Sequence, residues 1–278
     1  MVATPESFYV RDGDEYASTE LTRGPWDPGA QHAGPPAALL GREVARLASQ
    51  EPMRVGRITF EILRPIPIAP LRVRAEVVRP GRSVELVEAS LHAGGEVLVR
   101  ARAWRLRVEP VNLPSGVSSD QEPAVASGSS SLLRPGSVPP GPLEGNTGTF
   151  FETGQATGYH TAMEYRFISG GFLDAGPATV WMRMRHPLVL GEEAAPLERL
   201  LVAADSGNGI SATLDWRRYV FINVDLSVHL ARLPRGEWVG LDAITIAEPD
   251  GIGLTDTALL DLEGPVGRAA QTLLIRER

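Results

Sequence analysis

Residues 196–216, "PLERLLVAADSGNGISATLDW", decide between two very different folds. The string Gly207-Asn208-Gly209, with Ala212 three positions on, has the spacing of a turn that binds a dinucleotide pyrophosphate, which needs a strand before it. The preceding residues instead place apolar side chains at helical spacing after a proline: Leu197, Leu200, Leu201 and Ala204. The sequence therefore predicts a helix whose end the glycines mark, and not a nucleotide-binding α/β fold.

A second helix with a similar start lies in the first half of the chain. The segment "HAGPPAALLGREVARLAS" (32–49) has two prolines near its beginning and places Leu40, Val44 and Leu47 at helical spacing. Strand-like segments follow each helix in the same order: "GRITFEILRPIPI", "LRVRAEVVRP", "SVELVEASLHA" and "EVLVRARAWRLRV", then "VFINVDLSVHLARLP", "EWVGLDAITIAE", "LTDTALLDL" and "VGRAAQTLLIRE". The chain is therefore expected to contain one structural unit twice.

Residues 109–148 separate the two units. Pro, Gly and Ser dominate this segment, and it has no apolar period of either kind. So long a connector is unusual inside one core and natural between two. We predict an α+β protein with two domains, residues 1–108 and 149–278, each an antiparallel sheet wrapped around one long central helix, with a linker at 109–148.

The composition excludes several classes of chemistry. The 278 residues contain no cysteine and no lysine, which excludes thiolate nucleophiles, cysteine zinc sites and Schiff-base lysines. The net charge of −7 argues against a nucleic-acid partner. The five histidines lack the spacing of a metal-binding helix, and we expect no metal. Without an apolar signal segment or membrane span, we expect a cytoplasmic protein.

Two stretches resemble a known family. They are "PWDPGAQHAGPPAALL" (25–40) and "GLDAITIAEPDGIGLTDTALLDLEGPVGRAAQTLLIR" (240–276). Both are similar to acyl-CoA thioesterases of the double-hotdog type, which include bacterial thioesterase II, and the resemblance covers nearly the whole chain except the linker. It implies two tandem hotdog domains that hydrolyse acyl-CoA to free acid and coenzyme A without a metal or organic cofactor.

The resemblance also implies an active centre. The family uses an Asp on the second helix, a Thr or Ser before the next strand, and a Gln in the last strand to orient a water against the thioester. These positions fall on Asp205, Asn223 and Gln271. Asn223 departs from the family because an amide has no hydroxyl, which puts the rate and the substrate range in doubt.

The residues themselves agree with such chemistry. A carboxylate can accept the proton of the attacking water, and amides can hold water or stabilise the oxyanion. Asp205 in the last helical turn faces the negative end of the helix dipole, which raises its pKa, although an Asp there can also simply bond the turn backbone. Strand alternation places Gln271 on an apolar face with Ala269 and Leu273, where its amide needs a partner.

Alternation places Asn223 on the same face as Asp225 and Ser227, so Asn223 could equally lie on a solvated face, and Asp225 is a second candidate acid. At the first helix, Gly34 is a candidate N–H donor to the thioester oxygen, and His32 is a candidate lining residue of the substrate pocket. An N-terminal cap with an incidental histidine is the alternative. The chain has no G-x-S-x-G motif, which disfavours a serine hydrolase.

Three functions remain open from the sequence. The first is hydrolysis of acyl-CoA in fatty acid metabolism, with the acyl chain in an apolar tunnel beside the helices. The second is a hotdog protein that binds an acyl ligand without turnover. The third is an enoyl- or hydroxyacyl-CoA hydratase or dehydratase, which usually pairs an Asp with a His. A homo-oligomer is possible in each case.

Overall fold

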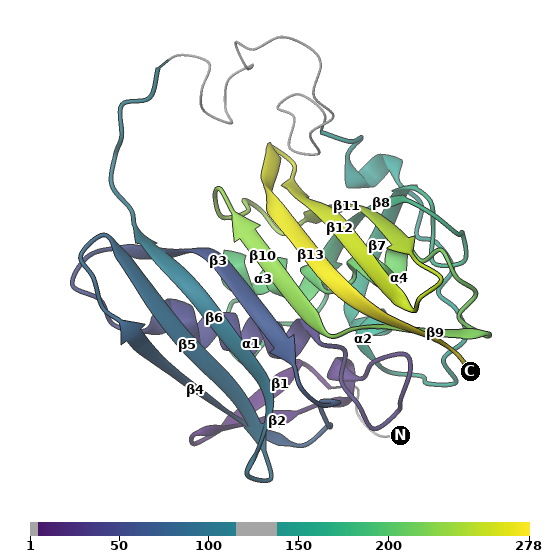
Figure 1. Ribbon diagram of the computed structural model, residues 1–278, viewed down its shortest axis with the longest axis horizontal. Coiled ribbons are helices and arrows are strands. Elements are labelled where there is room, and N and C mark those ends of the chain that lie inside the picture. Colours follow the sequence, from purple (N-terminus) through teal and green to yellow (C-terminus); the bar gives the residue numbers. More distant parts are fainter. Residues whose placement is uncertain (1–4, 115–137) are drawn as a thin grey trace.

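The computed structural model describes residues 5–114 and 138–278 (Figure 1). The elements of the first half are β1 (Tyr9–Asp12), β2 (Glu15–Ser18), α1 (Gly34–Arg46), β3 (Met53–Ile62), β4 (Pro70–Arg79), β5 (Val84–Ala93) and β6 (Glu96–Arg107). Those of the second half are α2 (Tyr159–Ala162), β7 (Met163–Ser169), β8 (Ala178–Met184), α3 (Pro196–Ala204), α4 (Gly207–Ile210), β9 (Tyr219–Asn223), β10 (Asp225–Leu230), β11 (Val239–Ala247), β12 (Ile252–Asp261) and β13 (Gly264–Glu277). Short 3₁₀ turns occur at Glu20–Thr22 and Pro142–Glu144.

Within the described residues, the strands form one continuous sheet of 13 strands. Its order is β1-β2-β4-β5-β6-β3-β10-β13-β12-β11-β8-β7, with β9 beside β13, and the neighbouring strands pair antiparallel. The junction between the halves is the pair β3–β10, in which Phe60 stands opposite Leu226. The prediction of antiparallel sheet is confirmed, whereas the joining of both halves into one sheet was not predicted.

The helices pack against one face of this sheet (Figure 1). Helix α1 contacts β3, β4 and β5, α3 contacts β8 and β11, and α4 contacts β11, β12 and β13. The second helix is not long as predicted, because α3 has nine residues and ends at Ala204. Gly207 then begins the short α4, where a Cβ would lie 2.5 Å from Thr257 Oγ1 and 2.9 Å from Gln271 Oε1. The glycine is therefore needed for close packing as well as for the helix end.

Helices α1 and α3 pack directly against each other in opposite directions. At one end, a Cβ on Gly34 would lie 2.3 Å from the carbonyl oxygen of Val202, so a side chain cannot fit there. At the other end, the buried Arg42 Nη1 donates to Glu198 Oε1 at 3.0 Å, and Arg42 also pairs with Glu192. Buried guanidinium and carboxylate groups need such partners because burial removes their hydration.

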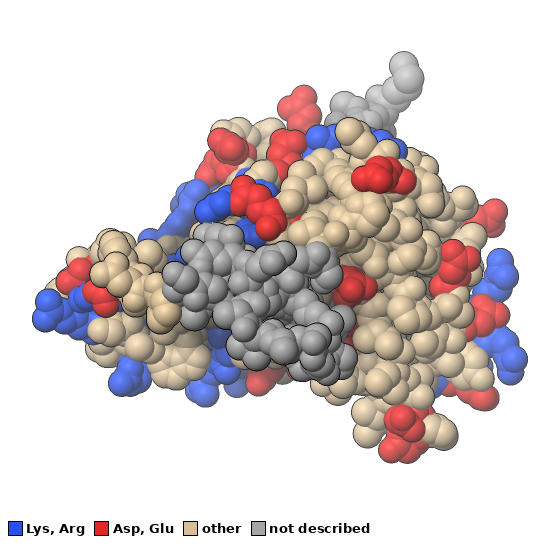
Figure 2. Space-filling view, turned by 90° about the horizontal axis from the view of Figure 1, so that it is seen from above, with Lys and Arg blue, Asp and Glu red and all other residues tan. Residues whose placement is uncertain are grey.

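The surface mixes charges of both signs. On the face in Figure 2, arginines stand beside acidic side chains instead of forming one basic stripe. Within residues 5–114 and 138–278, no helix is long and apolar enough to cross a membrane. Of the predicted linker 109–148, residues 115–137 lie outside the described residues, and the division into two domains stays a prediction.

Candidate active site

The turn between α3 and α4 positions Asp205 in the interior. Helix α3 starts at Pro196, and Glu198 accepts a hydrogen bond from the backbone N–H of Ala195 at 3.1 Å, which caps the helix start. Leu200 and Leu201 are fully buried and anchor the helix against α1 and the sheet. Asp205 is the C-terminal cap of α3 and is 4% exposed. Its carboxylate therefore has to find its partners within the protein.

Two amide side chains bind this carboxylate. Asn223 Nδ2 donates to Asp205 Oδ1 at 2.8 Å. Gln271 Nε2 lies 3.3 Å from the same oxygen and donates to the carbonyl of Asp205 at 3.2 Å, while Gln271 Oε1 accepts from the N–H of Asn208 at 3.1 Å. The structure thus brings together the three residues predicted for catalysis, Asp205, Asn223 and Gln271.

The strands explain how Asn223 and Gln271 reach Asp205. Gln271 is 1% exposed and lies on the inward face of β13, as alternation predicts. Asn223 stands opposite Leu273 at the end of β9. The strand is then interrupted at Val224, and β10 begins at Asp225. The break turns Asp225 outward, where its carboxylate accepts from the N–H of Thr272 at 2.6 Å. The prediction that Asn223 and Asp225 share a face is wrong, because it assumed an uninterrupted strand.

The first half of the chain contributes His32 from the start of α1. Its Nδ1 lies 3.1 Å from Asp205 Oδ2 and accepts the N–H of Gly34, also at 3.1 Å. The imidazole stacks on Tyr159 with 3.7 Å between ring centroids, and the Tyr159 hydroxyl donates to the carbonyl of Val202 at 2.7 Å. The N–H of Gly34, predicted as a donor to the substrate, is thus bonded to His32.

The environment places the titration of Asp205 near neutrality. Burial raises the pKa of Asp205 to about 7, and hydrogen bonds from Asn223 and the backbone of Ala33 and Gly34 oppose this rise. Burial lowers the pKa of His32 to about 3, so this imidazole is neutral at pH 7. The pKa of Asp205 is raised, as expected from the sequence, but the main cause is burial and not the negative end of the helix dipole.

A cavity of about 430 Å³ opens above these groups. Its polar lining includes His32, Asp205, Asn208 and Asn223 together with Asp27, Gln31 and Arg64, and its apolar wall includes Trp26, Ile62, Leu63, Ile66, Ile222 and Val224. Such a mixture of an apolar wall with a few convergent polar groups is typical of a site for a small molecule. A carboxylate that titrates near pH 7 at its floor is suited to accept a proton.

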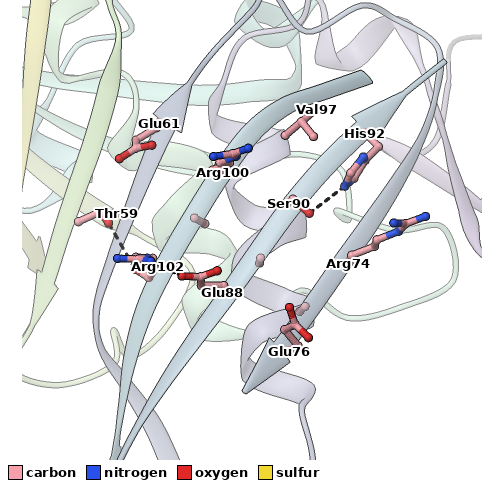
Figure 3. A pocket seen from close by; sticks show the side chains of 13 residues that line it. Thr59, Glu61, Arg74, Glu76, Glu88, Ser90, His92, Val97, Arg100 and Arg102 are labelled. Atoms are coloured by element: carbon pink, nitrogen blue, oxygen red, sulfur yellow. Dashed lines mark hydrogen bonds and ion pairs between the residues drawn. The ribbon is translucent and has the colours of Figure 1, made fainter. Parts of the chain in front are cut away.

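A larger hollow of about 730 Å³ lies on the face of β3–β6 turned away from α1 (Figure 3). Charged side chains line it, and several already bond one another: Glu88 accepts from Arg102 Nε at 2.7 Å, and Ser90 bonds His92 at 2.8 Å. It shares none of its lining residues with the cavity at Asp205. The candidate site is the separate cavity at Asp205. In the described part of the chain, no group of three or more His, Cys, Asp or Glu could hold a metal.

Sequence analysis missed Asn208, Tyr159 and Trp26. Asn208 belongs to the glycine string 207–209, which has the spacing of a nucleotide motif, and nothing in that string indicates that the backbone N–H of Asn208 bonds Gln271. Tyr159 precedes the strand β7, and its stacking on His32 depends on the contact between the two halves. Trp26 lines the cavity and stacks on Phe151 at 5.2 Å, and no local pattern distinguishes it from a core tryptophan.

Comparison with solved structures shows the hot dog fold. A protein assigned provisionally as a thioesterase II from Thermobifida fusca is 18% identical with a TM-score of 0.70, and the match covers 98% of this chain and 96% of that one. A hot dog protein of unknown function from Alicyclobacillus acidocaldarius is 16% identical with a TM-score of 0.65, and the match covers 97% of this chain and 95% of that one. An acyl-CoA thioesterase II of Mycobacterium marinum is 16% identical with a TM-score of 0.61, and the match covers 97% of this chain and 94% of that one. No curated protein matches the chain.

Comparison with protein families is more specific than comparison of folds. Residues 22–106 match the acyl-CoA thioesterase N-terminal domain, and residues 135–275 match the acyl-CoA thioesterase C-terminal domain. The two matches follow the order of the two halves, and together they include Asp205, Asn223, Gln271 and the start of α1. The chain belongs to the acyl-CoA thioesterase family.

Proposed function

We propose that this protein hydrolyses acyl-CoA thioesters to free acid and coenzyme A, with Asp205 as the base that activates a water. The observation that supports this most is the buried Asp205 carboxylate at the floor of the 430 Å³ cavity, bonded by the amides of Asn223 and Gln271. Membership of the acyl-CoA thioesterase family supports the same reaction.

In the proposed reaction, Asp205 accepts a proton from the water while the water oxygen attacks the thioester carbon. The carbon–sulfur bond then breaks, and the proton leaves with the coenzyme A thiol. Such a base contributes roughly 10²–10⁴-fold to the rate. With a pKa of about 7, Asp205 is ionised in a large fraction of molecules at neutral pH.

The amides have distinct tasks in this proposal. The NH₂ group of Asn223 donates to Asp205 Oδ1 and, at 3.2 Å, to the carbonyl oxygen of Asp225. Because both amide hydrogens are used in this way, Asn223 takes part in the reaction through its oxygen, which accepts a hydrogen bond from the water. Gln271 holds Asp205 in place through the carbonyl and the carboxylate. The amide of Asn208, which lines the cavity, donates to the oxyanion. Asn223 thus replaces the hydroxyl of the family pattern as an acceptor.

The proposal includes two tandem hotdog domains, residues 1–108 and 149–278, with the active site between them. It is supported by the repeated order of one helix and its following strands, and by the antiparallel contact of α1 with α3. The acyl-CoA partner, a cytoplasmic location, a role in fatty acid metabolism and the absence of a cofactor follow from the sequence expectations and stay predictions.

A thiol-release assay tests the proposed hydrolysis. Purified protein is mixed with acyl-CoAs from acetyl to palmitoyl, and free coenzyme A is measured with a thiol reagent. We expect turnover by the wild type and a loss of about 10²–10⁴-fold in Asp205→Asn. Asp225→Asn is the matched control, because that carboxylate bonds the backbone of Thr272 on the other face of the sheet. Equal losses in both variants, or binding without turnover at any chain length, would contradict the proposal.

One contact supports a second candidate, hydration of enoyl-CoA. His32 Nδ1 and Asp205 Oδ2 are 3.1 Å apart, so the chain has the Asp–His pair that such an enzyme uses. Asp205 would take a proton from water as the water oxygen adds to C3, and the protonated Asp205 would then deliver this proton to C2, while the neutral His32 orients the reacting groups. Crotonyl-CoA separates the two reactions: hydration removes the absorbance of the conjugated thioester without releasing thiol, whereas hydrolysis releases thiol.

A further inference from the structure

The cavity at Asp205 ends in a nearly closed recess. Beyond the carboxylate, the space between α1 and the sheet has a volume of only about 10 Å³. Asp205 and seven apolar residues line it: Ala33, Ala37, Phe60, Ile62, Ile66, Val99 and Leu226. It shares Ala33, Ile62, Ile66 and Asp205 with the 430 Å³ cavity, so it continues that cavity inward. A space of this size accepts about one water at most, and not an alkyl chain.

Phe60 is the largest side chain in this recess. It points inward from β3, is 1% exposed, and stands between Leu226 of β10 and Ala101 of β6 in the sheet register. The helix above the recess presents Ala33 and Ala37, whose side chains are too small to close it. Phe60 and its neighbour Val99 therefore occupy the space that an acyl chain would need to pass along α1.

The open part of the site also limits the substrate. At about 430 Å³ it lies near the lower end of the roughly 300–1,000 Å³ of small-molecule sites. The thiol end of coenzyme A, the thioester and the acyl group must share this volume. We infer that the substrates of this site have short acyl groups, of about two to six carbons, and that Phe60 sets the upper limit. This inference rests on the proposed hydrolysis of acyl-CoA at Asp205.

A limit on acyl chain length can be measured as the dependence of kcat/KM on the number of carbons. Each methylene that moves from water into an apolar site improves binding by about fourfold. A methylene that remains in water gives no such gain. With a closed recess, kcat/KM should rise over the first few carbons and then stop rising or fall, whereas an open tunnel would give a rise over many carbons. The recess beside α1, into which the predicted apolar tunnel would lead, has a volume of only about 10 Å³ in this structure.

The first test is the chain-length profile of the wild type. We expect the highest kcat/KM between acetyl- and hexanoyl-CoA, and values at least about tenfold lower for dodecanoyl- and palmitoyl-CoA. Turnover that is best with dodecanoyl- or palmitoyl-CoA would overturn the length limit while leaving the proposed hydrolysis intact. Absence of turnover at every length would instead overturn the proposed function.

The second test opens the recess. Phe60→Ala frees a volume of order 100 Å³ next to Asp205, so the ratio of kcat/KM for octanoyl-CoA over butanoyl-CoA should rise by about tenfold or more. Ile58→Ala is the matched control, because Ile58 is equally buried on the same face of β3 but does not line the recess. Val99→Ala opens the recess less and should raise the ratio by a smaller factor.

The Val99 variant keeps the test informative if Phe60→Ala does not fold. A thermal melt of each variant establishes folding before the kinetics are measured. If the recess variants change the octanoyl-to-butanoyl ratio no more than Ile58→Ala does, Phe60 does not set the chain length and the inference is wrong.

Discussion

Replacing Asp205 by Asn should stabilise the protein while it lowers the rate of hydrolysis by about 10²–10⁴-fold. Burial raises the pKa of Asp205 from an ordinary 3.8 to about 7, so the folded protein holds the proton more tightly than the unfolded chain. Ionising this buried group at high pH therefore lowers the free energy of unfolding. An Asn keeps the shape of Asp205 and has no charge to bury.

The magnitude follows from the two pKa values. Each pKa unit corresponds to about 1.4 kcal/mol, so a rise of about three units costs about 4 kcal/mol when Asp205 is fully ionised. The cost is absent below pH 4, builds up between about pH 4 and 7, and is constant above. The Asn side chain keeps one partner of the carboxylate, because its oxygen can accept from Asn223 Nδ2 as Asp205 Oδ1 does.

Urea unfolding of both proteins at pH 4 to 9 measures this effect. The stability of Asp205→Asn relative to the wild type should rise with pH to a plateau of about 4 kcal/mol near pH 8. The pKa of His32 is lowered from 6.5 to about 3 in the folded protein, so this imidazole destabilises both proteins as the pH falls below about 6.5. This contribution is common to both proteins and cancels in the difference between them. Asp225→Asn serves as the control for loss of one carboxylate. A difference that does not change with pH, or a less stable Asn variant at pH 8, would refute the raised pKa of Asp205.

Three further predictions concern the same site. The kcat/KM of the wild type should rise with pH up to about 7 and level off, because the base must be ionised, and a rate independent of pH from 5 to 8 would contradict this. Asn223→Ala should lower kcat/KM by about 10- to 100-fold. It should also move the rise of kcat/KM to higher pH, because the hydrogen bond from Asn223 lowers the pKa of Asp205. Asn223→Thr should recover part of the rate in the same assay. Gly34→Ala should lower the melting temperature and the rate together, because its Cβ would lie 2.3 Å from the Val202 carbonyl oxygen. A melting temperature within 1 °C of the wild type, which corresponds to about 0.6 kcal/mol for a chain of this length, would be inconsistent with that clash.

Patterns within one element predicted the local structure well. The spacing of Leu197, Leu200 and Leu201 predicts α3, and alternation in the last strand predicts the buried face of Gln271. Both depend on periodicity, which is a property of consecutive residues. Asn223 shows where this fails: a break at Val224 reverses the face of the next residues, and no composition signal marks it.

Contacts between the halves could not be predicted in the same way. The pair His32–Asp205 joins two segments far apart in the sequence, and it exists because α1 and α3 pack antiparallel with Gly34 against Val202. The closed recess depends on how the side-chain volumes of Phe60 and Val99 fill the space beneath α1. Packing of this kind is decided by three-dimensional shape, which the order of apolar residues does not contain.

The antiparallel pair of central helices has two ends, and the chain uses them for different purposes. One end holds Asp205 beside the start of α1, and the other holds Arg42 against Glu198 at the start of α3. A symmetric assembly of two identical halves would need the same residues at both ends, so that every change for catalysis would appear twice. Joining two unlike halves in one chain removes this requirement: one end can hold a buried carboxylate whose ionisation destabilises the fold, while ion pairs at the opposite end connect the two helices.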